Sequence, residues 1–300
     1  MAPRSTLIGA QEPLHAIIAR LVLGSPMSPS LKRLLAARVR AAFNDPAKGE
    51  RPVERSADGL FGPGSAAWRV HGDVTTMMVG GIAALLLQML HPAVLAGVWD
   101  HSNFRADMHG RLRRTARFIA LTTYGSRDEA EAAIAHVRAI HRRVTGTLPN
   151  GQPYAAEDPA LLTWVHVTET LSFLEAWRRY GEPAMTLADQ DRYFAETAVV
   201  ARGLGATGVP TTRAETLACI AAMRPALRAD SRTREVARLV MQRPGGTLEA
   251  LPLEIIQRAA VELLPGWARR MHGLRASALS RPLIAGGTLA LASTLRWAFR

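Results

Sequence analysis

An uncharged run at positions 79–99, "VGGIAALLLQMLHPAVLAGVW", constrains the fold more than any other feature of the sequence. A run of this length has to be shielded from water, either in a bilayer or in the core of a helical protein. It contains Gln88, His91 and Pro92, and the residue before a proline disfavours helical geometry. The run therefore predicts a buried core helix that breaks at the His-Pro step.

Helical patterns also dominate the rest of the chain, so the predicted fold class is all-α. Alanine, leucine and arginine are frequent, segments end at glycine or proline, and strand-like alternation is hardly present. Residues 44–67 form the one extended irregular stretch. We therefore expect an N-terminal helical arm and loop over 1–67, then a single multi-helix domain over 68–300 that is interrupted at 243–246 and at Pro265-Gly266.

Charge and cysteine content narrow the classes of function. The net charge is +12, but lysine occurs only at Lys32 and Lys48, and the arginines are scattered without any nucleic-acid-binding motif. Nucleic acid is therefore not an expected partner. A single cysteine, Cys219, excludes an internal disulfide and a cysteine-rich metal site, and its apolar surroundings predict a buried structural thiol.

The two ends of the chain bear on its location. The first residues lack a continuous apolar stretch followed by a small-residue cleavage site, so the cytoplasm is the expected compartment. The segment 282–293, "PLIAGGTLALAS", is too short to span a bilayer. Arginines flank it, and Trp297 and Phe299 follow. A docked terminal helix is the main expectation, and peripheral membrane contact is the alternative.

Two helices in the middle of the chain have marked ends. Ser126 and Glu129 form a capping-box pattern, and Gly146 is a stop signal, which predicts a helix over 127–145. Asp158-Pro159 provides a cap and a first-turn proline, and Gly181 closes the next helix, which predicts a helix over 159–180.

These ends decide which side chains share a face. On the 127–145 helix, His141 lies in the apolar stripe, whereas His136 is about 100° away from the centre of that stripe. On the preceding helix the spacing places four residues on one face, bordered by Arg114: Arg111, Thr115, Phe118 and Thr122. The sequence thus predicts a buried imidazole and a buried guanidinium on neighbouring helices.

Such groups need partners, because an unpaired buried charge or imidazole is strongly unfavourable. Two interpretations remain open from the residues alone. The first is a structural network in which Arg111 pairs with an acidic side chain and His141 bonds a backbone carbonyl. The second is a haem pocket, in which one neutral histidine holds iron and arginines bond the propionates.

The 159–180 helix carries His166 and Glu169 on one stripe. A di-iron carboxylate site uses paired Glu-x-x-His motifs, but here the order is reversed and no second motif is visible. A hydrogen bond between His166 and Glu169 that lines a pocket is therefore the preferred interpretation.

Three segments carry a resemblance to a known family: "GGIAALLLQMLHPAVLAGVWDHSNFRADMHGRLRRTARF", "HVRAIHRRVTG" and "YAAEDPALLTWVHVTETLSFLEAWRRYG". They resemble the MpaB-type oxygenases, which include the catalytic domain of the latex-clearing rubber oxygenases, most densely over residues 68–200. The resemblance implies an all-α domain with a globin-like core that binds haem b and its iron. It also implies an enzyme that acts with dioxygen.

The resemblance assigns roles to particular residues. The family's Arg-x-x-x-Thr motif maps onto Arg111 and Thr115, and its proximal haem ligand maps onto His141. Rubber oxygenases have a lysine just before the motif threonine, where this chain has Arg114. Arginine stays protonated and does not ligate iron, so a lysine-capped distal face is not expected.

The expected function is that of a haem b-dependent oxygenase that acts on a lipophilic small molecule, received by the apolar wall of residues 79–99. The distal face is expected to be open or water-bound, with His166, His91 or His101 as neighbours. Two other classes remain as alternatives: a non-haem di-iron or other metal-binding helical protein, and a non-catalytic helical scaffold.

Overall fold

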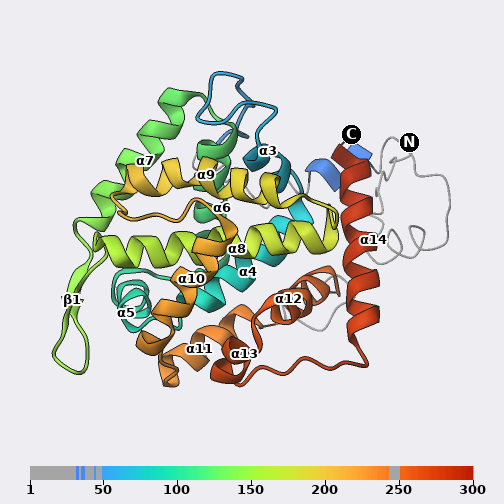
Figure 1. Cartoon of the computed structure of the whole chain (residues 1–300). Helices are drawn as coiled ribbons and strands as arrows, with labels where there is room; N and C mark the ends of the chain where they lie inside the picture. Colours follow the sequence, from blue (N-terminus) through green and yellow to red (C-terminus); the bar gives the residue numbers. More distant parts are fainter. Residues whose placement is uncertain (1–31, 34, 38–43, 45–48, 243–250, 300) are drawn as a thin grey trace, which may run out of the picture.

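The chain folds as an all-α protein with one small β-hairpin (Figure 1). The structure is a computed structural model that describes residues 32, 33, 35–37, 44, 49–242 and 251–299. Most of the predicted N-terminal arm and the interruption predicted at 243–246 lie outside these residues. The elements are α3 (Ala66–His71), α4 (Val74–Gln88), α5 (Pro92–His101), α6 (Met108–Tyr124), α7 (Arg127–His141), β1 (Thr145–Thr147), β2 (Pro153–Ala155), α8 (Pro159–Tyr180), α9 (Leu187–Leu204), α10 (Arg213–Met223), the 3₁₀ helix η2 (Arg224–Ala226), α11 (Ser231–Val240), α12 (Leu251–Leu263), α13 (Gly266–His272) and α14 (Arg281–Phe299).

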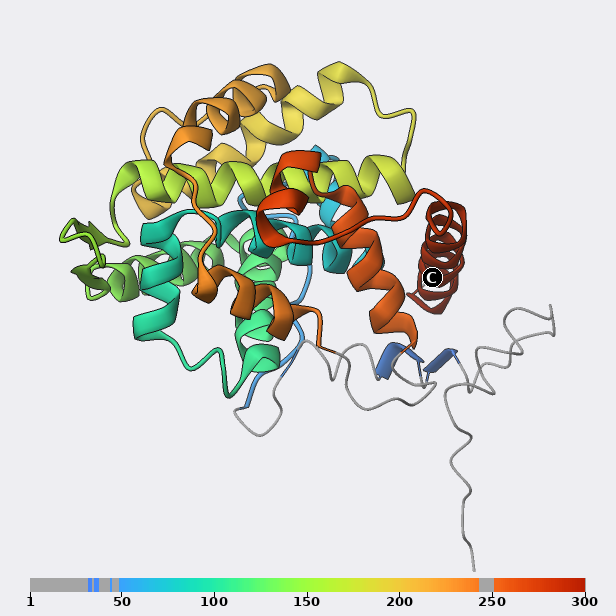
Figure 2. The ribbon, with the colours of Figure 1, turned by 90° about the horizontal axis from the view of Figure 1, so that it is seen from below.

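The helix pair α4 and α8 forms the centre of the molecule, with α12 and α14 packed against α4 (Figures 1 and 2). Gly80 allows the pair to approach closely, since a Cβ atom there would lie 2.7 Å from the Phe173 ring. Most apolar side chains of α4 belong to the main hydrophobic core. The apolar run is thus part of this core, and its role as one wall of a substrate site stays a prediction.

The predicted break in that run is confirmed. Helix α4 ends at Gln88, α5 begins at Pro92 with His91 as its N-cap, and the two helices are bent by 104°. Within the described residues no single helix is long and apolar enough to cross a membrane. Among these residues, only α4 and α5 taken together as one bent pair reach the length and apolar composition of a membrane span.

The predicted caps are confirmed, but the hairpin was missed. Ser126 and Glu129 form the capping box of α7, and α8 spans 159–180 as predicted. Helix α7 ends at His141, four residues early, because the chain turns into β1. Gly146 is a strand residue opposite Tyr154, and a Cβ atom there would lie 2.6 Å from the Tyr154 hydroxyl. It therefore serves the hairpin and is not a helix stop.

The terminal helix α14 docks on the body, as expected. Ile284, Thr288 and Ala292 are buried. The Arg296 guanidinium donates to the buried Asp73 carboxylate at 2.6 Å and to the Tyr180 carbonyl at 2.8 Å. Peripheral membrane contact through this segment stays a prediction.

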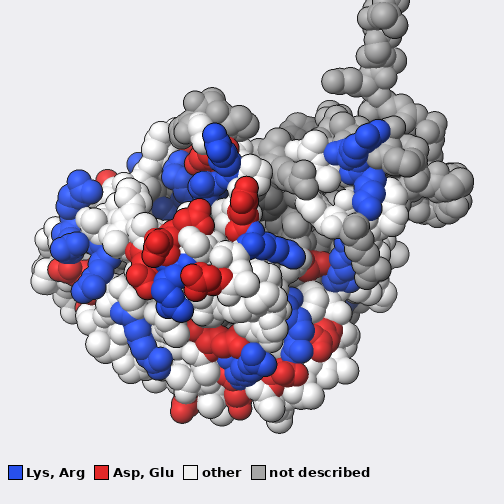
Figure 3. Space-filling view, turned by 90° about the horizontal axis from the view of Figure 1, so that it is seen from above, with Lys and Arg blue, Asp and Glu red and all other residues white. Residues whose placement is uncertain are grey.

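Basic and acidic side chains are interspersed on the face shown in Figure 3. Arg69 on α3 pairs with Asp189 at 2.8 Å and with Glu182 at 3.2 Å. Part of the arginine excess is thus neutralised by neighbouring carboxylates. The absence of a nucleic-acid partner remains a prediction.

Cys219 on α10 is a free, half-buried thiol that packs against the main core. Burial raises its pKa, which disfavours the reactive thiolate. The environment agrees with the predicted structural role, although the side chain is less buried than expected.

Candidate cofactor site

Helices α6 and α7 form a helical hairpin in which Arg111 and His141 each lie far from the connection between the helices. The helices pack against each other and are joined by Gly125 and Ser126. Arg111 lies 14 residues before this connection and His141 lies 15 after it, so at 1.5 Å per residue both are about 20 Å from the closed end. We call this region, defined by Arg111 and His141, the open end of the hairpin.

His141 is the last residue of α7 and is half-buried, whereas His136 is exposed. The predicted difference between the two histidines is confirmed. Burial lowers the pKa of His141, so its imidazole is neutral at pH 7. Its Nδ1 atom is buried and has no hydrogen-bond partner among the described residues, which leaves a lone pair or an N–H group for a ligand.

Arg111 is a half-buried cation without a carboxylate partner among the described residues. Burial lowers its pKa, and the neighbouring charge of Arg114 lowers it further. Its Nη1 donates to the Ser102 hydroxyl at 3.4 Å, and no acidic side chain in the described part of the chain pairs with it. Within the described residues, the structural network predicted as one alternative is therefore not formed at Arg111.

Asp107, four residues before Arg111, makes its contacts with other groups. Asp107 caps α6 by accepting a hydrogen bond from the Gly110 amide at 2.7 Å, and its other oxygen lies 3.6 Å from Arg114. The backbone bond and Arg114 together hold the pKa of Asp107 below its ordinary value. Arg114 is thus an exposed, ion-paired residue, and its positive charge adds to that of Arg111.

The predicted face of α6 is buried only in part. Thr122 is buried and Phe118 is half-buried, but Thr115 is exposed and its hydroxyl donates to the Arg111 carbonyl at 3.2 Å. Periodicity assigns a residue to a face but does not say how far along the helix a neighbour covers that face. The expectation of an inward-facing Thr115 is wrong in this structure.

On α8, His166 and Glu169 are both perturbed by burial. Burial lowers the pKa of His166 to about 4, with a smaller contribution from Arg202, and raises that of Glu169 to about 7. The His166 Nε2 atom is buried without a partner among the described residues. No hydrogen bond joins His166 to Glu169 in the described part of the chain, so the predicted bond between them is not formed.

One family comparison covers most of the chain. The family described as "ER-bound oxygenase mpaB/B'/Rubber oxygenase, catalytic domain" matches residues 68–297. The chain belongs to this family. No similar curated protein and no similar solved structure was found, so the globin-like arrangement of the core stays a prediction.

In this oxygenase domain, a second polar cluster was missed by sequence reasoning. The His71 Nδ1 atom lies 2.8 Å from the Thr123 hydroxyl and its Nε2 atom lies 2.8 Å from the Tyr193 hydroxyl. Burial lowers the pKa of His71 to about 3 and, with Glu169 nearby, raises that of Tyr193 well above its ordinary value. Nothing in "AAWRVHGD" marks this histidine, because its partners are far away in sequence.

The other two histidines named as neighbours of the distal face differ. His91 is half-buried against Trp164, with ring centroids 6.4 Å apart, and its Nδ1 atom is buried without a partner among the described residues. His101 is exposed, and its Nε2 atom lies 3.0 Å from the Thr145 carbonyl of β1. The β-hairpin therefore engages His101 Nε2 in a hydrogen bond, whereas His91 Nδ1 is left without one in the described part of the chain.

Among the described residues, no group of three or more His, Cys, Asp or Glu side chains is placed to hold a metal ion. A haem iron takes as little as one ligand from the protein. The unpartnered imidazole nitrogen of His141 therefore suits haem better than a site built from side chains alone.

Proposed function

We propose that this chain is a haem b-dependent oxygenase in which His141 ligates the iron and Arg111 pairs with a haem carboxylate. The observation that carries the proposal is the open end of the hairpin. There the chain holds one buried imidazole nitrogen without a partner and one half-buried guanidinium without a carboxylate in the described residues. A prosthetic group with a metal and carboxylates satisfies both at once.

The chain's own residues have separate tasks in this site. The lowered pKa keeps His141 neutral, which is the form that ligates a metal. Arg111 presents a fixed fork of N–H donors to an anion, and its burial away from other acids strengthens that pairing. When bound, haem supplies the activation of dioxygen, which side chains cannot provide.

Arg114 leaves one face of the site without a ligand from α6. A guanidinium stays protonated and ion-paired to Asp107, so it contributes charge and not coordination. On α8, His166 is neutral and Glu169 has a pKa of about 7. We assign His166 to hold or release a proton at its unpartnered Nε2 atom, whereas Glu169 lies near Tyr193.

The substrate is proposed to be a lipophilic small molecule. This class rests on the family, whose description names rubber oxygenases. Substrate choice follows the shape of a pocket and not the identity of an iron ligand, so the reaction outcome is not carried over.

Haem titration of the purified full-length chain tests the proposal. We expect an intense Soret band and stoichiometric haem. His141→Ala should lose haem, whereas His136→Ala, an exposed histidine five residues away on the same helix, should retain it. Retention of haem with an unchanged spectrum in His141→Ala would overturn the ligand assignment.

The same preparation separates the alternatives. Bound iron without a Soret band, lost in His166→Ala, would indicate a non-haem metal protein. A chain that takes up neither haem nor iron after incubation with both would be a helical scaffold.

A further inference from the structure

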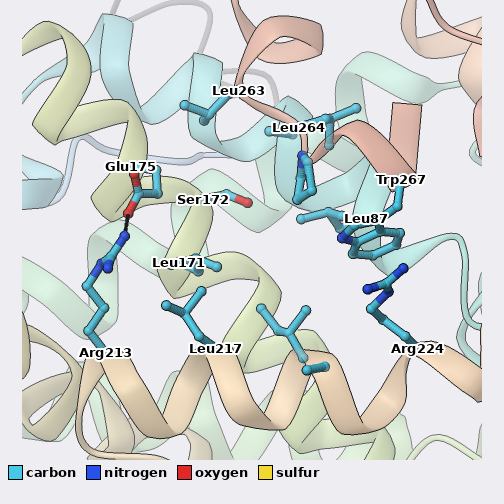
Figure 4. Close-up of a pocket in the computed structure, with 14 residues that line it drawn as sticks. Leu87, Leu171, Ser172, Glu175, Arg213, Leu217, Arg224, Leu263, Leu264 and Trp267 are labelled. Carbon is cyan, nitrogen blue, oxygen red and sulfur yellow. Dashed lines mark hydrogen bonds and ion pairs between the residues drawn. The ribbon is translucent and has the colours of Figure 1, made fainter. Parts of the chain in front are cut away.

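An open cavity of about 330 Å³ lies between α4, α8, α10 and the junction of α12 with α13 (Figure 4). This volume lies within the range of small-molecule sites, roughly 300–1,000 Å³. Most of its lining is apolar, with Leu87 from α4, Leu171 from α8, Leu217 from α10 and Trp267 from α13. Its shape and lining suit the apolar part of a ligand.

One face of α10 lines the cavity along its length. Arg213, Leu217, Ala221 and Arg224 follow at spacings of four, four and three residues, so they share one face. This face has an arginine at each end and apolar residues between. Eleven residues at 1.5 Å each separate the two arginines by about 16 Å along the axis.

The end at Arg213 is neutralised. The Arg213 Nη2 atom donates to the Glu175 carboxylate at 2.8 Å, and Arg178 donates to the same carboxylate at 3.0 Å. Figure 4 shows the Glu175–Arg213 pair at one side of the cavity, away from Arg224 and Trp267. The Glu175 carboxylate therefore balances the charge at this end, so we do not expect an anionic ligand group to bind there.

The end at Arg224 is not neutralised. Its guanidinium stacks over the Trp267 ring at 5.0 Å, and no acidic side chain in the described ranges pairs with it. A second hollow shares Ala221, Arg224 and Trp267 with the first and is also lined by Arg270. Arg270 is exposed and likewise lacks an acidic partner in that part of the chain. The cavity therefore opens onto two unneutralised guanidinium groups.

We propose that this cavity binds an amphiphile with one apolar chain and one oxyanion head, such as a medium-chain carboxylate. The chain lies along Leu171, Leu217 and Leu87. The head lies between Arg224 and Arg270, where two guanidinium groups match a carboxylate geometrically and electrostatically. A cationic or neutral head group would not form ion pairs with these two guanidinium groups.

This site is separate from the proposed cofactor site. Leu171 and Glu175, which line it, lie about 140° and 180° around α8 from His166. The same helix thus presents one face to the cavity and the opposite face to the perturbed His166. Binding of the amphiphile does not depend on haem.

Calorimetric titration of the full-length, haem-loaded chain with monomeric dodecanoate, below its micelle concentration, tests the proposal. We expect one saturable site. Arg224→Gln should weaken binding at least tenfold, and Ala221→Trp, which places an indole across the cavity from an exposed position, should abolish it. Arg138→Gln, which removes an exposed arginine from α7, should leave the affinity unchanged.

Several outcomes would overturn the proposal. Dodecyltrimethylammonium binding as tightly as dodecanoate would remove the role of the head group. Non-saturable uptake, or equal binding by Ala221→Trp in a variant with wild-type helicity, would remove the cavity as the site. Binding to phosphatidylglycerol vesicles without binding of monomeric dodecanoate would assign the arginines to a membrane surface.

Discussion

Polar side chains gather at both ends of α6, but they have hydrogen-bond partners at one end and lack them at the other. At its closed end, Thr123 bonds His71, which bonds Tyr193, and both imidazole nitrogens have partners at 2.8 Å. At the open end, Arg111 has no carboxylate and His141 Nδ1 has no partner among the described residues. Because a buried polar group needs a partner, the closed end is satisfied by the protein itself, whereas the open end leaves groups for the ligand that we propose. Helix α6 thus lets a satisfied polar cluster be compared with a proposed binding site.

The largest expected effect is a difference in stability between variants at the two ends of α6. His71→Leu leaves the Thr123 and Tyr193 hydroxyls without their shared partner in the interior, and should lower the free energy of unfolding by about 3 kcal/mol. His141→Ala in the haem-free chain should change it by about 1 kcal/mol or less, because no hydrogen bond at Nδ1 is lost. Urea denaturation of both variants measures the difference.

Tyr193→Phe is the matched control for that comparison, since it removes one hydroxyl and keeps the ring. It should cost about 1–2 kcal/mol, less than His71→Leu. Equal losses for His71→Leu and His141→Ala would contradict the division between the two ends.

The closed end should also show in the pH dependence of stability. The folded pKa of His71 is about 3, against 6.5 for an ordinary histidine. The unfolded chain therefore binds a proton below pH 6.5 that the folded chain does not bind, so stability is full above pH 6.5 and falls as the pH drops toward 3. Between pH 6.5 and 5 this amounts to about 1–2 kcal/mol.

The slope measured by urea denaturation over that interval should be smaller in His71→Leu than in wild type. His166, whose pKa is also lowered, should supply part of the remaining slope. An unchanged slope in the variant would mean that His71 does not stay neutral in the folded protein.

The sequence predicted those parts of the site that depend on local signals. Capping at Ser126 and a period of 3.6 residues were enough to distinguish His141 from His136. The His91–Pro92 break and both ends of α8 were likewise local. Membership of the oxygenase family was also evident from three motifs in order.

What the sequence could not supply depends on distant contacts. Periodicity placed Thr115 beside Arg111, yet Thr115 is exposed, because coverage of a face depends on neighbouring elements. The His71–Tyr193 bond joins residues 122 positions apart. The hairpin was missed because strands of three residues are too short to show alternation, although Pro149, Asn150 and Gly151 marked its turn.

A smaller effect on stability should show whether the open end binds a ligand or serves the fold. Arg111→Gln removes a buried charge that has no carboxylate partner, so the haem-free chain should lose less than about 1 kcal/mol of stability. Haem affinity should nevertheless fall at least tenfold, because the anion loses its partner. Haem transfer to apomyoglobin measures this, with Arg114→Gln as the exposed control. A large loss of stability without loss of haem would make Arg111 structural.

Thr115→Val should have the smallest effect on the haem-free chain, within about 0.5 kcal/mol, because the hydroxyl is exposed and bonds only its own helix. This variant tests whether the hydroxyl gains a second role once the site is filled. The same haem-transfer measurement should show unchanged retention if Thr115 keeps its bond to the Arg111 carbonyl. A severalfold faster loss of haem, at unchanged stability, would instead show that the threonine turns toward the cofactor, and would extend the open end by one helical turn along α6.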